Sequence, residues 1–345
     1  MARRKSFDFI IISLLFTFTA IFFPMRNILN GKASVYTEGK AECVIEAQSG
    51  RILYQSHGDL RLPIASTTKI VTAATVLRLC DNLHTTISIP KEAVGIEGSS
   101  VYLQEGDEYT VEALLYGLML RSGNDCAVAL ALHCSGSVAV FTAKMNETAQ
   151  MAGALETHFS NPHGLPCKNH YSTAKDMCLI TAYAMKNPTF RQIVQSAYYE
   201  PRHWKNKNKM LSNYEGAIGV KTGYTKEAGR CLVSAANRKG MTLICTVLNC
   251  PQMYERSSEL LDDAFQSYQM KKILNKEDRF LVEDGNRKIH ACIKEEFSYP
   301  LAEGEEAQLE YVTRQVKKEK DKEVVGEIEI YLSKRLLFLG NLYKL

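Results

Sequence analysis

The sequence lacks the residue spacings that bind zinc. It has neither a C-x-x-C pair nor an H-E-x-x-H segment, although it contains 10 cysteines and 8 histidines. Internal repeats and low-complexity tracts are also missing, and the mean hydropathy of −0.18 is too low for a multi-span membrane protein. We therefore expect no metal and no cofactor, in a globular chain whose 345 residues suit two domains.

The body of the chain also lacks net charge. Of the 42 basic residues, five lie in residues 1–33, and of the 38 acidic residues one lies there, so that residues 34–345 hold 37 of each sign. The formal charge of +4 thus belongs to the N-terminal segment. A neutral body argues against an extended basic surface, and we expect no nucleic acid as a partner.

Residues 1–33 are typical of an export signal. Three basic residues precede the apolar run Phe9–Phe23, which is shorter than the roughly 20 residues of a comfortable membrane span. Gly31 and Ala33 place small residues where a signal peptidase could cut, although this site lies far from the apolar run. The pattern predicts an exported protein, at the outer face of the cell membrane or in the cell-wall space. It leaves open whether the segment is cleaved or remains as a membrane anchor.

Most of the cysteines lie in apolar runs, such as Cys80 in VLRLC and Cys245 in LICTV. A free thiol in such a run behaves as a small apolar side chain. We therefore expect buried free thiols in place of the disulfides that exported proteins often carry. The ten are Cys43, Cys80, Cys126, Cys134, Cys167, Cys178, Cys231, Cys245, Cys250 and Cys292.

The pattern of apolar residues divides the body of the chain into two domains. Residues 34–270 combine strand-like runs with helical periodicity, and residues 271–345 contain short alternating segments. We predict an α+β domain followed by a small β-rich domain. In the first we expect strands at Ala41–Gln48, Gly50–Gln55, Ile218–Lys221, Cys231–Ala236 and Thr242–Leu248, and helices at Ala65–Cys80, within Val111–Ala152 and at Glu259–Gln269. In the second we expect strands at Phe280–Val282, Lys288–Ile293, Ala307–Val312, Glu327–Leu332 and Ser333–Leu345, with a hairpin tip at Lys317–Lys322.

One serine–lysine pair stands out as a candidate nucleophile and base. A lysine can take a proton from serine when burial or a nearby cation lowers its pKa, and the S-x-x-K spacing places both side chains on one helix face. Only the first of three such pairs opens an apolar helix, where a lysine would be costly without a function. A proline lies inside the second pair, and the third is typical of a helix N-cap followed by a solvent lysine. The pairs are Ser66/Lys69, Ser88/Lys91 and Ser172/Lys175.

Two further motifs occur once each in the chain. Ser122-Gly123-Asn124 follows a helical run, and Lys221-Thr222-Gly223 ends a strand-like run. On a strand Lys221 and Gly223 face the same side, and the glycine leaves room for a substrate backbone. Taken singly, the first motif could be a turn that ends a helix and the second a polar strand end. Together with Ser66/Lys69, in this order, they indicate a catalytic serine.

S-x-x-K, S-x-N and K-T-G in this order resemble the penicillin-recognising serine enzymes. The surrounding segments narrow the resemblance to the D-alanyl-D-alanine carboxypeptidases, the low-molecular-mass penicillin-binding proteins. It covers roughly residues 40–270, and the C-terminal segment is similar to the small β domain of many members. The resemblance implies an antiparallel sheet with a cluster of helices in the catalytic domain. The matching segments are Pro63–Thr72, Leu114–Ala127, Asn161–Leu165, Ser172–Met177 and Gly219–Leu232.

The resemblance also implies the role of each catalytic residue. Lys69 would take the proton of Ser66, which attacks the terminal D-Ala-D-Ala bond of a peptidoglycan pentapeptide. The backbone N–H groups of Ser66 and Tyr224 would hold the oxyanion. Ser122, close to Lys221, would pass a proton to the departing D-alanine, and water would then release the acyl-enzyme.

Substrate contacts follow from the same resemblance. Asn124 would bind the substrate's amide, and Lys221 and Thr222 would hold its terminal carboxylate beside Gly223. Arg256 would be a further contact of that carboxylate, or else a surface arginine in the first turn of a helix. β-Lactams would acylate the same serine. If the protein is membrane-bound, the N-terminal segment would hold it, since we expect the last 13 residues (Ser333–Leu345) to form a strand in preference to an anchor.

Alternatives remain within and outside this family. A β-lactamase would need a deacylating base, commonly a glutamate between the second and third motifs, and Glu147 and Glu156 lie there without a familiar context. A D,D-endopeptidase would share the same motifs. A catalytically silent peptidoglycan-binding protein is disfavoured, because all three motifs are intact.

Overall fold

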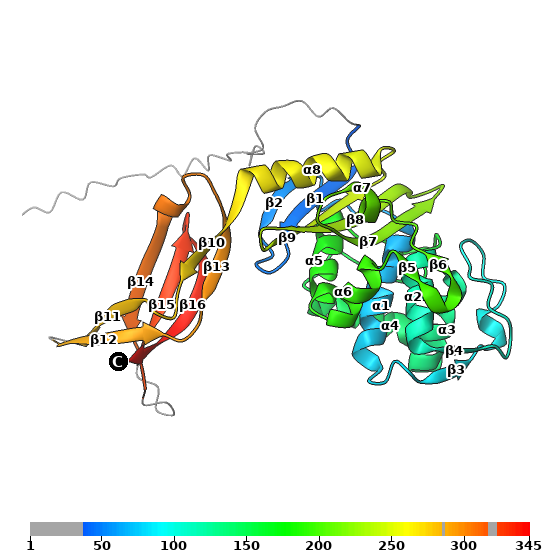
Figure 1. Ribbon diagram of the computed structural model, residues 1–345, viewed down its shortest axis with the longest axis horizontal. Helices are drawn as coiled ribbons and strands as arrows, with labels where there is room; N and C mark the ends of the chain where they lie inside the picture. Colours follow the sequence, from blue (N-terminus) through cyan, green and yellow to red (C-terminus); the bar gives the residue numbers. More distant parts are fainter. Residues whose placement is uncertain (1–36, 285–286, 317–322) are drawn as a thin grey trace, which may run out of the picture.

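Two folded parts follow one another in the computed structural model, which describes residues 37–284, 287–316 and 323–345 (Figure 1). The first part combines a sheet with a cluster of helices, and the second consists mainly of strands. The predicted export segment, residues 1–33, lies outside the described residues, as does the predicted hairpin tip Lys317–Lys322.

The first part is built on an antiparallel sheet of five strands that is buried on both faces. Alternate residues of the three inner strands enter separate apolar clusters: Ile244 and Leu248 face the helices, whereas Leu243 and Cys245 face α8 (Met253–Ser267), which lies across the other side (Figure 1). Two covered faces explain why these inner strands are rich in apolar residues on both sides. Across the sheet the order is β2 (Ile52–Ser56), β1 (Ala41–Glu46), β9 (Met241–Leu248), β8 (Gly229–Arg238) and β7 (Ala217–Thr225).

Four of the helices under the sheet begin at a capping side chain. The hydroxyls of Thr110, Ser137 and Thr173 accept hydrogen bonds from the first turns of α2, α4 and α5, and Asn187 does the same for α6. α1 is buried over most of its length, as its apolar sequence predicts. The helices on this side are α1 (Lys69–Leu79), α2 (Val111–Tyr116), α3 (Asn124–Ser135), α4 (Val138–Met151), α5 (Ala174–Met185) and α6 (Pro188–Gln195), whereas the short α7 (Met210–Asn213) lies on the α8 side.

No single helix among the described residues is long and apolar enough to cross a membrane, and only α3 and α4, which meet at a sharp bend, reach that length and hydropathy together.

Short elements connect these helices. The short elements are the 3₁₀ turns η1 (Ala65–Thr68), η2 (Lys91–Ala93) and η4 (Glu200–Arg202), the π-helical turn η3 (Gly117–Arg121), and two hairpins, β3 (Thr86–Ser88) with β4 (Glu108–Thr110) and β5 (Tyr198–Tyr199) with β6 (Trp204–Lys205).

The second part packs a two-stranded and a five-stranded sheet around a small core. Val282, Ile293, Ile328 and Leu342 meet in this core. The five-stranded sheet has the order β11 (Arg279–Asp284), β12 (Arg287–Ile293), β16 (Arg335–Lys344), β15 (Val324–Leu332) and β14 (Leu309–Gln315). The other pairs β10 (Tyr268–Leu274) with β13 (Phe297–Ala302), and the 3₁₀ turn η5 (Glu306–Gln308) precedes β14.

Arg51 ties the two parts together. Arg51 directly precedes β2. Its side chain forms an ion pair with Glu305 at 2.6 Å and donates a hydrogen bond of 2.6 Å to the carbonyl of Pro300. Its guanidinium also lies over the rings of Tyr268 and Tyr299. The contact joins the β1–β2 hairpin to the β10–β13 pair.

The predicted α+β class with a C-terminal all-β region is confirmed. The helix predicted at Glu259–Gln269 is wrong at both ends, since α8 begins at Met253 and ends at Ser267. Its first turns bury Arg256 and Ser257, which no apolar period marks. The last two residues of the predicted helix instead start β10, a strand missed because its centre carries two lysines. The predicted final strand is confirmed as β16.

The cysteines differ in exposure more than the sequence suggested. Six are buried, Cys80, Cys134 and Cys292 are partly exposed, and Cys167 is exposed. All ten are free thiols in this structure.

Candidate active site

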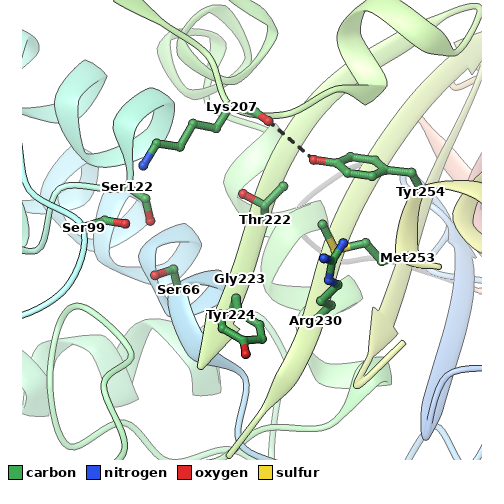
Figure 2. A pocket seen from close by; sticks show the side chains of 10 residues that line it. All are labelled: Ser66, Ser99, Ser122, Lys207, Thr222, Gly223, Tyr224, Arg230, Met253 and Tyr254. Carbon is green, nitrogen blue, oxygen red and sulfur yellow. Dashed lines mark hydrogen bonds between the residues drawn. The ribbon is translucent and has the colours of Figure 1, made fainter. Parts of the chain in front are cut away.

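A cleft of about 430 Å³ lies between the end of β7 and the helices (Figure 2). It brings Ser66, Ser122, Thr222, Gly223 and Tyr224, which stand far apart in the sequence, to one place. The complete lining is Ser66, Ser99, Ser122, Lys207, Thr222, Gly223, Tyr224, Arg230, Met253 and Tyr254.

Ser66 lies in a tight turn that leads into α1. The preceding Ala65 has a φ of +48°, a region that residues with side chains rarely adopt. Two hydroxyls brace the turn: Thr67 donates to the carbonyl of Ile64 at 2.7 Å, and Thr68 donates to that of Ala65 at 2.8 Å. The serine is thereby held half-exposed at the wall of the cleft.

Lys69 follows one turn later and is fully buried. Burial, and then the charge of Lys221, lower the pKa of its amine well below the usual lysine value. A neutral amine has two N–H groups and one lone pair. The carbonyl of His163 at 2.7 Å and the amide oxygen of Asn124 at 2.6 Å can only accept, so they take the two N–H groups. The lone pair is then left to face the Ser66 hydroxyl, 3.1 Å away.

The segment Asn161–Leu165 supplies the backbone carbonyl that holds Lys69. The side chain of Asn161 accepts hydrogen bonds from the N–H groups of His163 and Gly164, at 3.2 and 2.7 Å, and so fixes the loop. Gly164 has a φ of +92°, and a Cβ there would lie only 1.9 Å from the carbonyl oxygen of Ala65. Only glycine allows the loop to approach the nucleophile turn this closely.

His170 braces the same turn from behind. Its Nδ1 accepts a hydrogen bond from the N–H of Ser160 at 3.1 Å, so the ring proton is assigned to Nε2, which lies 2.8 Å from the Thr68 hydroxyl. Burial lowers the pKa of His170 to about 4, which keeps the ring neutral. The series of hydrogen bonds that runs from His170 through the Thr68 hydroxyl ends on the carbonyl of Ala65.

Ser122 and Lys221 form a second serine–lysine pair, this time between the helical part and β7. The ammonium of Lys221 donates to the Ser122 hydroxyl at 3.0 Å and to the carbonyl of Thr222 at 2.8 Å. Burial, and then the charge of Lys207, lower the pKa of Lys221 to about 7. Ser122 has a φ of +65° and directly follows the π-helical turn η3, a local irregularity common at functional sites.

Gly223 lets β7 pass close to the nucleophile turn. A Cβ on Gly223 would lie 3.1 Å from the backbone nitrogens of Ser66 and Thr67. The side chain of the next residue, Tyr224, is 65% exposed at the mouth of the cleft. The backbone N–H of Ser66 therefore lies beside the strand end that would hold a substrate.

Asn124 and Asp125 begin α3 just behind the cleft. Besides accepting from Lys69, Asn124 donates to the carbonyl of Glu97 at 2.5 Å. Asp125 accepts from the backbone N–H groups of Val101 and Leu103 and so holds the loop that carries Ser99. Asn124 is 3% exposed, and both of its polar atoms have partners within the protein.

Two further cations line the cleft, and neither was predicted from the sequence. Figure 2 shows the side chain of Lys207 extended toward Ser122, with Arg230 on the opposite wall. Burial, and then the charge of Arg121, lower the pKa of Lys207. None of the lining residues is acidic, so the cleft is suited to an anionic ligand. Neither cation belongs to a motif, and only the fold brings them here.

Arg256 is not brought to the cleft. Its guanidinium forms a buried, two-bonded ion pair with Glu42, at 2.9 and 2.7 Å, and a second ion pair with Glu259 at 2.7 Å. The Tyr54 hydroxyl completes this network on the α8 side of the sheet. The structure therefore corrects both interpretations of Arg256 made from the sequence, the substrate contact and the surface arginine: the residue is buried, and it does not line the cleft.

The remaining sequence candidates lie elsewhere. Ser88 ends β3 and Lys91 begins η2, away from the cleft lining. In the third pair Thr173, one residue after Ser172, is the actual N-cap of α5, and Lys175 forms an ion pair with Asp59.

Neither glutamate that could serve as a deacylating base lines the cleft. Glu147 pairs with Lys144 and Arg78, and Glu156 pairs with Arg61. Within the part of the chain that the structure describes, no group of three histidine, cysteine or acidic side chains could hold a metal ion.

Comparison with known proteins agrees with this geometry. The family model described as D-alanyl-D-alanine carboxypeptidase matches residues 30–252. The carboxypeptidase DacF of Bacillus subtilis is 34% identical over 248 residues, which cover 67% of this chain and 63% of that protein. A D-alanyl-D-alanine carboxypeptidase of a Streptomyces species is 42% identical over 234 residues, or 61% of this chain and 80% of that protein.

Solved structures give the same result. Penicillin binding protein 5 of Haemophilus influenzae has a TM-score of 0.75 at 25% identity, and the match covers 91% of this chain and 98% of that chain. A serine-to-alanine variant of a Streptomyces DD-transpeptidase has a TM-score of 0.64 at 36% identity, covering 68% of this chain and all of that one.

Proposed function

The chain belongs to the D-alanyl-D-alanine carboxypeptidase family, and we propose that it is a serine peptidase that removes the terminal D-alanine from peptidoglycan stem peptides. The observation that carries this proposal is the contact of Ser66 with Lys69, a fully buried amine whose lone pair has only that hydroxyl to face. β-Lactams, which present a reactive amide and a carboxylate, would acylate the same serine.

Acylation begins with a proton transfer from Ser66 to Lys69. The serine oxygen then attacks the carbonyl carbon of the D-Ala-D-Ala bond, and the electron pair of the C=O moves onto oxygen. The backbone N–H groups of Ser66 and Tyr224 are the proposed oxyanion donors, and one such donor is worth about 3–4 kcal/mol where it has been measured. The close passage of Gly223 beside the backbone nitrogen of Ser66 supports this pairing.

The departing D-alanine needs a proton and a place for its carboxylate. Ser122, hydrogen-bonded to Lys221, would deliver the proton to the leaving nitrogen. Lys221 and Thr222 would hold the terminal carboxylate, and Asn124 would offer its remaining amide N–H to the peptide. The absence of acidic side chains from the cleft lining supports recognition of an anionic terminus.

A β-lactamase is the competing function within the superfamily. Rapid turnover of penicillin requires a base that activates water against the acyl-enzyme. Glu147 and Glu156 are both engaged in ion pairs away from the cleft lining, which favours slow release and thus a carboxypeptidase over a β-lactamase. We also propose that the enzyme works outside the cytoplasm, where its substrate lies, as the sequence of residues 1–33 predicts.

Intact-protein mass spectrometry after penicillin treatment tests the proposal. We expect one penicilloyl adduct that persists over the time course, and no adduct on Ser66→Ala. Ser88→Ala, which changes the corresponding serine of another S-x-x-K pair, is the matched control and should label normally. Labelling of Ser66→Ala would overturn the assignment of the nucleophile. Fast loss of the adduct with release of hydrolysed penicillin would favour the β-lactamase.

A further inference from the structure

Two thiols touch at the ends of α1 and α3 that lie away from the cleft. Cys80 is the first residue after α1, and Cys134 is the last but one residue of α3. Their sulfur atoms are 3.0 Å apart and share a hydrogen bond. The other ends of the same two helices carry Lys69 and Asn124. The catalytic assignment uses neither cysteine.

We propose that Cys80 and Cys134 are a built oxidation site that closes to an intrachain disulfide. A disulfide bond is about 2.05 Å long, so the two sulfurs need to approach by only about 1 Å. The two thiols meet just after the end of α1 and in the last turn of α3.

Exposure separates this pair from the other neighbouring thiols. Cys43 and Cys178 also interact, but both are fully buried, so a dissolved oxidant has no path to them. Cys80 and Cys134 are both partly exposed. Cys167 is more exposed, but it has no cysteine beside it among the described residues and can form only a mixed disulfide.

The hydrogen bond also prepares the pair chemically. The contact lowers the pKa of Cys80 and raises that of Cys134, because a thiolate at Cys80 can accept a hydrogen bond from the S–H of Cys134. Cys80 is thus the attacking thiolate and Cys134 the resolving thiol, the arrangement common to oxidation-sensitive pairs.

A small disulfide such as oxidised glutathione completes the reaction. The Cys80 thiolate attacks one glutathione sulfur, forms a mixed disulfide and expels a glutathione thiolate. Cys134 then loses its proton to solvent and attacks the Cys80 sulfur, which expels the second glutathione thiolate. The two protein thiols are oxidised by two electrons in total, and one oxidised glutathione is reduced to two thiols.

The bond would restrain the helical cluster without altering the catalytic groups. It joins two positions that are 54 apart in the sequence, which reduces the freedom of the unfolded chain. Lys69 is ten residues from the end of α1, about 15 Å along the helix axis, so the acylation geometry should not change. The disulfide is therefore expected to raise stability and leave penicillin labelling as it was.

Oxidation of the purified protein tests the site. Incubation with oxidised glutathione, followed by blocking of the remaining thiols and non-reducing peptide mapping, should show a Cys80–Cys134 cross-linked peptide and a mass lower by two hydrogens. Relative to the reduced protein, the oxidised form should melt higher by roughly 10 °C. Cys80→Ser and Cys134→Ser should each abolish the cross-link and the shift in melting temperature. Cys167→Ser is the matched control and should keep both.

Three results would overturn the inference. The first is that only mixed disulfides form at Cys80 or Cys134. The second is that the cross-link maps to another pair, and the third is that it forms without any rise in melting temperature. Penicillin labelling of the oxidised and reduced forms, expected to agree within twofold, is independent of these results. A loss of labelling in both forms would count against the proposed function and not against the disulfide.

Discussion

Replacing Gly164 with alanine tests how the loop and the nucleophile turn fit together. The new Cβ would lie 1.9 Å from the Ala65 carbonyl oxygen, 2.4 Å from its carbon and 2.9 Å from the Thr68 hydroxyl. Ordinary contact begins near 3.4 Å, so backbone atoms must separate by roughly 1.5 Å. The moving parts are the turn that holds Ser66 and the loop whose carbonyl binds Lys69.

The expected loss of activity follows from that displacement. A misplacement of about 1 Å in a catalytic group costs on the order of a hundredfold in rate, so we expect penicillin acylation of Gly164→Ala to slow by at least about 100-fold. The backbone conformation adds a second effect, because a side chain at a φ of +92° costs about 1–3 kcal/mol of stability.

Gly153→Ala separates the two effects. Gly153 has a similar φ of +80°, but a Cβ there meets no atom within 4 Å. It should therefore show the backbone cost alone, as a lower urea midpoint with a normal acylation rate. The assay is the second-order rate of labelling by a fluorescent penicillin, measured on folded protein for both variants. If Gly164→Ala acylates as fast as Gly153→Ala, the loop does not position the nucleophile and the reasoning fails.

Two further predictions concern charge. The pKa of Lys221 is lowered to about 7, so the fraction of Lys221 that is charged falls as the pH rises through 7. We therefore expect kcat/KM for a peptide ending in D-Ala-D-Ala to decline over that range. A pH profile that stays flat well above neutral pH would contradict the proposed role of Lys221 in binding the carboxylate. Glu42→Gln should reduce the free energy of unfolding by about 3–5 kcal/mol, because it leaves the buried guanidinium of Arg256 without its main partner. Urea unfolding measures that loss, and a change within 1 kcal/mol would show that the network contributes little.

The chemistry could be predicted from the sequence wherever it depends on local spacing. Ser66 and Lys69 are three residues apart, so any helical conformation of this segment places their side chains on one face. The alternation in β7 likewise puts Lys221 and Gly223 on one side of the strand. The apolar runs Cys231–Ala236 and Thr242–Leu248 predict strands, and the structure adds that each face of their sheet meets its own apolar cluster.

Residues that act through distant contacts gave no such signal. Lys207 and Arg230 line the cleft although neither lies in a motif. His170 stands close in sequence to matching segments, but its bond to Thr68 crosses 102 positions and could not be derived from spacing. Arg256 is the opposite case: its position in the sequence suggested a substrate contact, but in the structure its guanidinium forms an ion pair with Glu42.

The sequence by itself therefore determined which groups are available and which of them share a helix face or a strand face. The tertiary structure decided their protonation states and their partners. Lys69 is a base only because burial removes its amine from water, and because the carbonyl of His163 and the side chain of Asn124 at the start of α3 take both of its N–H groups. Desolvation and hydrogen bonding depend on atoms brought together from distant parts of the chain, so they cannot be predicted from local spacing.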